Sequence, residues 1–358
     1  MKSQVAVLRT RPETVLEDYG RLMRLVKYDQ VLSRDQDLIL KLNLSWTKYF
    51  PACSSQPWQV DGVLTTLVAD GYDRARIFPV ENKTVVTNPV AGCRNNKWAP
   101  VLARHGVPFI PLPDVEWTVY PFRSPLLKLN RIFPEGIQIP KMYVGKSVCH
   151  LPTVKTHGHT TTTGAIKNAF GGLLKEVRHY AHEFIHEVMV DLMYMQRELH
   201  PGVFAVMDGT VMGDGAGPRT MLPRLGNILL ASADQVAIDA IAARIMGFDP
   251  LSIPYLRMCH ERGLGVADPR DIEIVGDAAA AALTMGFKTS RSLVIWGDQL
   301  IRRGPLRPLK HLLLHSPLVV WAPFASNVYH DVLWYPTVGR ARIGAFSATP
   351  WGRLFEQY

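Results

Sequence analysis

Cysteine is scarce in this chain of 358 residues, which contains only Cys53, Cys93, Cys149 and Cys259. The four residues lie far apart, and none belongs to a C-x-x-C pair. This spacing excludes a zinc ribbon and a self-contained iron–sulfur cluster of the ferredoxin type. We therefore expect a reduced, cytoplasmic protein.

Long apolar stretches are also missing. No run of 18 apolar residues occurs, so we expect no transmembrane helix. The first residues, MKSQVAVLRTRPET, lack the apolar core of a signal peptide. Both absences agree with the cytoplasmic location expected from the cysteines.

Acidic residues are fewer than basic ones: 31 Asp and Glu stand against 40 Lys and Arg, a net charge of +9. The basic residues are scattered, apart from an excess at Arg302–Arg307 and Lys310, and no run of five occurs. No aromatic-basic RNA motif is present either. We expect anionic small molecules, and no nucleic acid, as partners.

A hydrophobic fraction of 47% and a charged fraction of 20% are typical of a globular protein with a large core. Short apolar runs alternate with helical patterns, which predicts an α/β fold: a mostly parallel sheet flanked by helices. The expected strands cover residues 5–9, 37–44, 75–80, 107–112, 146–154, 202–208, 227–231 and 271–275. We assign residues 1–287 to this domain and expect an irregular extension, rich in Pro and aromatic residues, over 288–358.

Several expected strands end in polar side chains, which would meet at one edge of a parallel sheet, where such folds bind ligands. These side chains are Lys41, Asn43, Glu81, Asn82, Lys155, His157, Asp208 and Asp234. The alternative is that polar residues follow strands because loops are wet. Asp234 is expected to cap the helix that follows it, and Asp239, within that helix, to pair with a base such as Lys41 or to be exposed.

The most informative stretch runs from Leu151 to Met193. Its polar part leads into a helix start, where backbone N–H groups and the helix dipole favour an anion. The residues expected to bind an anionic ligand or cofactor are Thr161, Thr162, Thr163, Gly164, Lys167 and Asn168. The Walker A pattern is absent, and a Thr-rich capping turn is the alternative.

The helix after Gly164 is expected to be long and to carry a stripe of His179, His182 and His186, with Glu183 beside it. Imidazoles three and four residues apart can share a divalent metal, here zinc, nickel, iron or magnesium. A solvated, His-rich face is the alternative. His157 and His159 form a second pair that could bind metal or act as a base.

Five segments carry a resemblance to a known family: KLNLSW, TKYFPACSSQPWQVDGVL, LPTVKTHGHTTTTGAIKNAFGGLL, VMDGTVMGDGAGP and SADQVAIDAIAARIMGFDP with ERGLG. Together they resemble, over about residues 35–276, the bacterial and archaeal family called domain of unknown function 362. Members often carry ferredoxin-like cysteine clusters, which this chain lacks, so no electron-transfer role is implied.

A weaker likeness is to the lactate racemase superfamily, whose members can use a nickel pincer nucleotide. His157, Gly164, Lys167 and the helical histidines follow a comparable order, although the racemase's glycine-rich sequence is absent.

Two functions remain open. In the first, the chain is an enzyme acting on an anionic small molecule: Lys41, Lys155 and Lys167 bind the anion, His157 is base or ligand, and Asp208 is a second carboxylate. In the second, it is a non-catalytic partner that docks through its aromatic C-terminal tail to another protein or a membrane surface. The apolar residues of 311–340 must pack on their own domain, on a second subunit of a homo-oligomer, or on a membrane surface, in that order of expectation.

Overall fold

The computed structural model describes residues 3–84, 86–302, 304–309, 312–313 and 321–358. Its central sheet has ten strands, eight of them in the order β12-β1-β11-β10-β7-β2-β3-β4, with β8 beside β10 and β9 beside β8. The bounds are β1 Ser3–Arg9, β2 Leu38–Lys41, β3 Ile77–Glu81, β4 Ile110–Pro111, β7 Ser147–His150, β8 Thr153–His157, β9 Thr161–Thr162, β10 Val203–Ala216, β11 Thr220–Ser232 and β12 Ile272–Gly276. Six pairings are parallel, and β11 pairs antiparallel with β1 and β10, as β9 does with β8. The mostly parallel α/β fold is confirmed.

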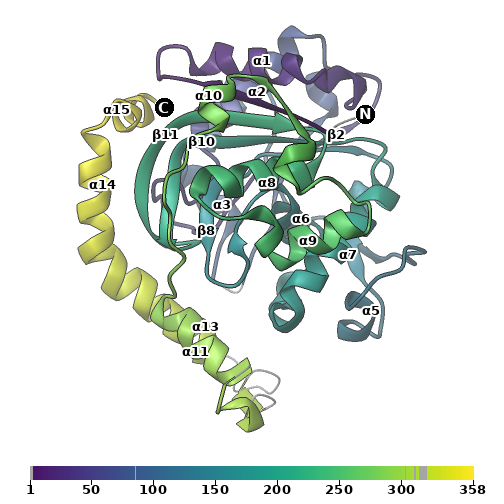
Figure 1. The fold of residues 1–358 in the computed structure, drawn as a ribbon, viewed down its shortest axis with the longest axis vertical. Coiled ribbons are helices and arrows are strands. Elements are labelled where there is room, and N and C mark those ends of the chain that lie inside the picture. Colours follow the sequence, from purple (N-terminus) through teal and green to yellow (C-terminus); the bar gives the residue numbers. More distant parts are fainter. Residues whose placement is uncertain (1–2, 85, 303, 310–311, 314–320) are drawn as a thin grey trace.

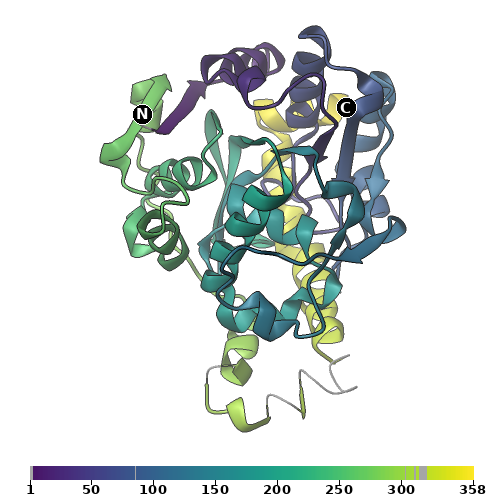
Figure 2. The same cartoon turned by 90° about the vertical axis from the view of Figure 1, so that its right-hand side faces the viewer.

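Strand β2 is buried on both faces, which explains its uninterrupted apolar run Leu38–Leu40. In β2, Ile39 packs into one core cluster, while Leu38 and Leu40 pack into the other. Helices α6 (Ala165–Leu173), α7 (Ile185–Leu199), α8 (Gln235–Met246) and α9 (Pro254–Glu261) build the first cluster, and α1 (Val15–Leu25), α2 (Pro57–Ala69) and α4 (Trp98–His105) build the second. Figures 1 and 2 show these helices on opposite sides of the sheet.

The expected cap is confirmed: Asp234 accepts hydrogen bonds from the N–H groups of Val236 and Ala237 at the start of α8.

The expectation of a single long helix after Gly164 is wrong. The chain forms α6, leaves the helix at Leu174, continues as the 3₁₀ helix η5 (Glu176–Phe184) and then enters α7. The Arg178 guanidinium stabilises the break, because it donates to the carbonyl oxygen of Leu174, where α6 ends, and to that of Lys175. Histidine spacings derived for one continuous α-helix therefore do not apply here.

Residues 209–216, which fall outside the strands expected from the sequence, form the outer half of β10, which pairs with β11 up to Ala216 and Thr220. Its glycines allow close approach of β8. A Cβ on Gly217 would lie 1.8 Å from the carbonyl oxygen of Thr156. The tip of the β10–β11 hairpin therefore lies against the end of β8.

The C-terminal extension is helical where it is described, contrary to the expected irregular structure. It contains α11 (Leu293–Arg302), α13 (Trp321–Asn327), the π-helix η10 (Val328–Gly339), α14 (Arg340–Ser347) and α15 (Pro350–Gln357). Part of the apolar tail of 311–340 packs on its own domain, as expected first: ring centroids lie 5.3 Å apart for Trp334 and Phe50 and 5.1 Å apart for Tyr335 and Trp46. Beyond this tail, the Trp351 ring lies 5.2 Å from that of Trp58. The Phe355 ring stacks 3.8 Å from that of Tyr49. Two of the basic residues, Arg303 and Lys310, lie outside the described residues. So do residues 314–320 of the apolar tail. Across the described part of the chain, none of the helices combines the length and apolar character needed to cross a membrane.

Candidate functional site

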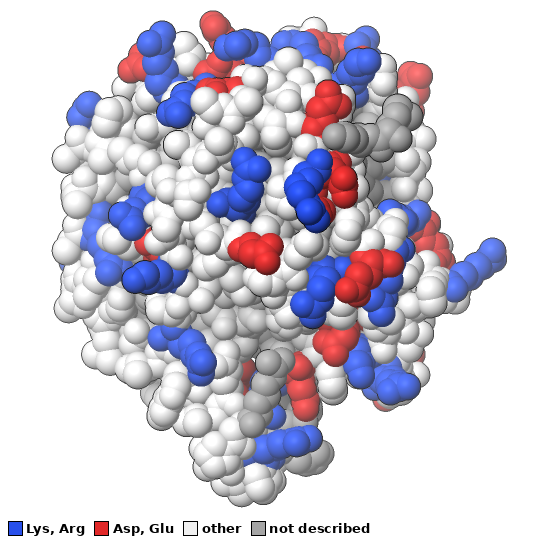
Figure 3. Space-filling model, in the orientation of Figure 1, with Lys and Arg blue, Asp and Glu red and all other residues white. Residues whose placement is uncertain are grey.

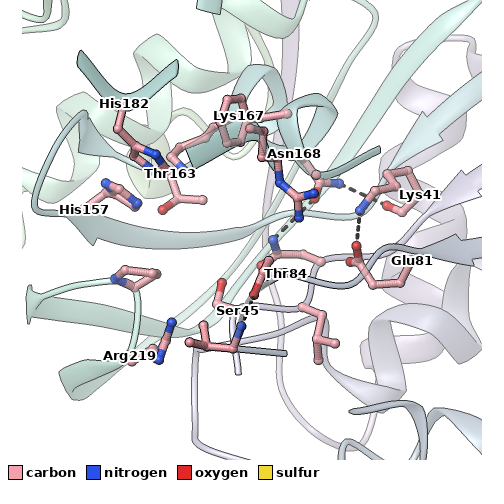
Figure 4. A pocket seen from close by; sticks show the side chains of 17 residues that line it. Lys41, Ser45, Glu81, Thr84, His157, Thr163, Lys167, Asn168, His182 and Arg219 are labelled. Atoms are coloured by element: carbon pink, nitrogen blue, oxygen red, sulfur yellow. Dashed lines mark hydrogen bonds and ion pairs between the residues drawn. The ribbon is translucent and has the colours of Figure 1, made fainter. Parts of the chain in front are cut away.

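The carboxyl ends of β2, β3 and β8 border one cavity of about 240 Å³ (Figure 4). Its walls come from strand ends, from α6 and η5, and from the tip of the β10–β11 hairpin. The lining residues are Lys41, Asn43, Leu44, Ser45, Glu81, Thr84, Val86, His157, Thr163, Lys167, Asn168, Phe170, Gly171, Arg178, His182, Pro218 and Arg219. Six of these, namely Lys41, His157, Thr163, Lys167, Asn168 and His182, are candidate site residues derived from the sequence.

A buried ion pair forms the floor of the cavity. The Lys41 ammonium lies 2.8 Å from Glu81 Oε1 and donates to the Leu42 carbonyl oxygen at 2.6 Å. Burial lowers the pKa of Lys41, and the charge of Glu81 counters part of that effect. The other oxygen, Glu81 Oε2, is buried and has no hydrogen-bond partner among the described residues. One acceptor at the floor therefore remains available to a ligand.

Lys155 does not line the cavity but holds a residue that does. Its ammonium donates to Asn43 Oδ1 and to Thr153 Oγ1, both at 2.5 Å. Asn43 in turn donates to Asn168 Oδ1 at 3.3 Å. Burial lowers the pKa of Lys155 to about 7. The residue expected to bind an anion directly thus orients the amides that face the cavity.

Three further cations surround the upper part of the cavity. The Lys167 Nζ atom lies 5.4 Å from the centroid of the Phe170 ring. The Arg178 Cζ atom lies 5.9 Å from the same centroid. Burial, together with the charge of Arg178, lowers the pKa of Lys167 to about 8. Arg219, from the hairpin tip, donates to Ser326 at 3.4 Å. With Lys41 these make four cations against the single carboxylate of Glu81 among the described lining residues.

Three histidines meet on one side of the cavity. His157 accepts a hydrogen bond at Nδ1 from the backbone N–H of His159, which leaves the imidazole proton of the neutral form on Nε2. The His159 ring lies 5.8 Å from that of His157 and 5.2 Å from that of His182. Burial, with nearby Lys167, holds the pKa of His157 well below its usual range. His157 is therefore a neutral donor at neutral pH.

The expected histidine stripe is divided between two places. His182 lies edge-on to Phe170 at the cavity, whereas His186 stacks on Tyr255 and, with Glu183, borders a separate hollow. The His179 side chain lies outside the described part of the structure. Among the described residues, no group of three or more His, Cys, Asp or Glu is arranged to hold a metal ion.

The first two N–H groups of α6 bind a carboxylate of the chain itself and not an external anion, contrary to the expectation for Thr161–Gly164. Asp239 Oδ1 accepts from the N–H of Ala165 at 2.6 Å, and its Oδ2 accepts from that of Ile166 at 3.1 Å. Gly164 permits this approach, since a Cβ there would lie 2.3 Å from Asp239 Oδ1. The expectations that Asp239 pairs with a lysine or is exposed are both wrong.

The three threonines before Gly164 differ in their contacts, and only one of them lines the cavity. The Thr162 hydroxyl bonds to the Tyr255 hydroxyl at 2.9 Å, and Thr161 has a φ of 66° in the turn. The Thr163 hydroxyl instead is buried, lines the cavity and has no hydrogen-bond partner among the described residues. Of the threonines and Gly164, only Thr163 faces the cavity.

Asp208 lies outside the cavity lining. Its carboxylate is fully buried and accepts hydrogen bonds from Tyr19, Trp58 and both the N–H and hydroxyl of Thr210. Burial raises its pKa. Four donors satisfy this carboxylate, so its contacts stabilise the fold.

The sequence did not point to Arg178, Arg219 or Phe170. Arg178 lies in a 3₁₀ helix that was expected to be α-helical, and Arg219 lies at a hairpin tip that was expected to be a loop. Glu81 and Asn43, by contrast, were recognisable as polar residues at strand ends.

Comparison with known proteins covers the same region. The family model described as "Domain of unknown function (DUF362)" matches residues 38–244. This range includes every residue that lines the cavity. A thylakoid-associated protein of Synechocystis sp. is 27% identical over 155 residues, which cover 41% of this chain and 43% of that protein. No solved structure matches. The chain therefore belongs to the family of the domain of unknown function DUF362.

Proposed function

We propose that the chain is an enzyme acting on a small molecule with a phosphate or carboxylate group, which binds in this cavity. The observation that carries the proposal is a cavity where, among the described lining residues, four cations face one carboxylate and where Thr163 and Glu81 each keep a buried oxygen without a partner. Buried polar groups without partners are rare in native proteins and are common where a ligand supplies the partner.

Charge favours an anion over a neutral ligand. Lys41 and Arg178 are held in place by hydrogen bonds to carbonyl oxygens, so a ligand would meet cations that need little reorganisation. Opposite unit charges 4 Å apart attract by about 4 kcal/mol at the effective dielectric constant typical of such sites, about 20. The volume is below the roughly 300–1,000 Å³ of drug-sized sites, which favours a small metabolite.

Two groups are suited to proton transfer or polarisation. Lys167, with a pKa of about 8, exists in both protonation states near neutral pH, as general acid–base catalysis requires. His157 is suited to donate its Nε2 proton in a hydrogen bond to the ligand, because it stays neutral. This assignment moves the base from His157 to Lys167. A divalent metal, as expected from the histidines of the sequence, stays a prediction. The roles given to Lys167 and His157 do not depend on one.

Titration with sulfate, whose charge is constant near neutral pH, tests the anion site. We expect Lys167→Met and Arg219→Met to weaken binding roughly tenfold each, since charge-assisted hydrogen bonds contribute about 1.5–3 kcal/mol. Wild-type affinity should fall as pH rises through about 8, because Lys167 loses its charge, and this dependence should be absent in Lys167→Met. Arg257→Ala, an exposed cation outside the cavity, is the matched control. Equal affinity in all variants would refute the site.

We also propose a cytoplasmic location. All four cysteines are buried and free, which suits a reducing compartment.

A further inference from the structure

The most exposed large apolar side chains of the described chain all belong to the C-terminal extension. They are Phe324 (70% exposed), Leu293 (67%), Val332 (63%), Leu333 (58%), Leu312 (52%) and Trp296 (52%), and we call this set the apolar patch. Elsewhere the highest value is 51%, for Val119. Helices α11 and α13, which carry Leu293, Trp296 and Phe324, both lie at the lower end of the molecule in Figures 1 and 2.

These side chains are exposed because the opposite sides of their helices face the domain. In α11, Gln299 donates to the Gly158 carbonyl oxygen, and Asp298 lies 3.7 Å from His159. In α13 and η10, Ser326 and His330 are buried, and His330 packs edge-on to Trp46. The extension is thus fixed by polar and aromatic contacts, while the side chains of the apolar patch remain half or more exposed.

The C-terminal extension holds most of the net positive charge. Residues 288–358 contain nine Lys and Arg against three Asp and Glu, and this difference of six makes up two thirds of the net charge of +9. Lys288, Arg291 and Arg307 are exposed and have no ion-pair partner among the described residues. Arg291 borders the same shallow hollow as Trp296. On the face drawn in Figure 3, Lys and Arg elsewhere are interspersed with Asp and Glu.

We propose that the apolar patch docks the protein on the surface of an anionic bilayer. Trp296 and Phe324 would enter the interfacial layer, and Lys288, Arg291 and Arg307 would lie beside the lipid headgroups. A second copy is the weaker occupant, because two such faces would bring like charges together. Docking here would also place the rim of the cationic cavity near the headgroups, since α11 contacts Gly158 and α13 contacts Arg219.

Flotation of the full chain with vesicles tests this proposal. We expect binding to phosphatidylcholine vesicles that contain phosphatidylglycerol, little binding to phosphatidylcholine alone, and loss of binding as salt is raised. Trp296→Ala/Phe324→Ala should lower vesicle affinity at least tenfold. Arg291→Ala/Arg307→Ala should lower it roughly twenty-five-fold, which is about fivefold per charge.

The matched controls are Val119→Ala/Leu222→Ala, which removes exposed apolar residues elsewhere, and Arg11→Ala/Arg257→Ala. Both should bind like wild type. Lys167→Met should also bind like wild type, which separates this surface from the cavity. Absence of binding to anionic vesicles, or equal binding by the patch variants, would overturn the proposal. So would a wild-type dimer in sedimentation velocity that the apolar variant converts to monomer.

Discussion

At the residue scale, the buried pair of Lys41 and Glu81 gives the sharpest prediction. Glu81→Gln should destabilise the fold by about 3–5 kcal/mol, because it leaves a buried ammonium without its counter-charge. The same change should strengthen sulfate binding, since the only carboxylate among the described lining residues is gone. Urea unfolding and sulfate titration measure the two effects.

The control for this prediction is Glu116→Gln. Glu116 pairs with Lys141 at 3.0 Å, but both side chains are mostly exposed. Such pairs contribute about 0–1 kcal/mol, so the control should unfold like wild type. A loss of similar size in both variants would contradict the importance assigned to burial.

Lys155 predicts a dependence of stability on pH. Burial lowers the pKa of Lys155 to about 7 in the folded protein, from 10.5. Between these values the unfolded chain binds more protons than the folded one, so its contribution makes the fold more stable as pH rises from about 7 to about 10. Lys155→Met should flatten this rise, as followed by urea unfolding at several pH values. Lys141→Met, at an exposed site, should keep the wild-type slope, and an unchanged slope in Lys155→Met would refute the assignment.

Much of the candidate site was predictable at the residue scale because strand ends are recognisable. A buried strand that ends in Lys41 or Glu81 must place that side chain at the ligand-binding edge of a parallel sheet. What could not be predicted was which polar groups the fold uses for itself. Asp208 and Asp239 looked as reactive as Glu81, but partners distant in sequence satisfy them. Metal binding by the histidines of 179–186 stays a prediction.

At the element scale, the short apolar runs of the strands and the cap at Asp234 were readable, because each depends on neighbouring residues. The break between α6 and α7 was not, because Arg178, which bonds the Leu174 carbonyl oxygen after α6, also donates to that of Lys83, which is distant in sequence. The close packing of Gly172 against the floor of the cavity was not readable either. A Cβ on Gly172 would lie 2.7 Å from the Tyr143 hydroxyl and 3.1 Å from Lys41 Cε. The glycine is therefore required by packing against Lys41.

The change Gly172→Ala should accordingly destabilise the fold by about 1–3 kcal/mol, as overpacking does, and should weaken sulfate binding by moving Lys41. Gly344→Ala is the contrasting substitution. Gly344 lies in α14 with no atom near its absent Cβ, so alanine should stabilise by up to about 1 kcal/mol through helix propensity. Urea unfolding compares the two, and a neutral Gly172→Ala would contradict the close contact.

At the scale of the whole molecule, the alternation of strands and helices was enough to predict an α/β fold. It was not enough to place the extension, because Pro323 and Pro336 suggested an irregular chain. The π-helix η10 instead accommodates Pro336 within a continuous helical run. The run ends beside α2, where aromatic residues far apart in sequence complete one core cluster.

The extension therefore has two separable parts, a C-terminal brace and the apolar patch. Trp351 packs on Trp58 and donates from Nε1 to Asn227 Oδ1 at 2.7 Å, with only 1% of its surface exposed. Trp351→Ala should thus destabilise the fold by about 3–5 kcal/mol and lower Tm by several degrees in calorimetry. The variant Trp296→Ala/Phe324→Ala should leave Tm within about one degree of wild type, since both side chains face solvent. If the patch variant instead lost stability as Trp351→Ala does, Trp296 and Phe324 would be part of the fold, and the brace and the patch would not be separable.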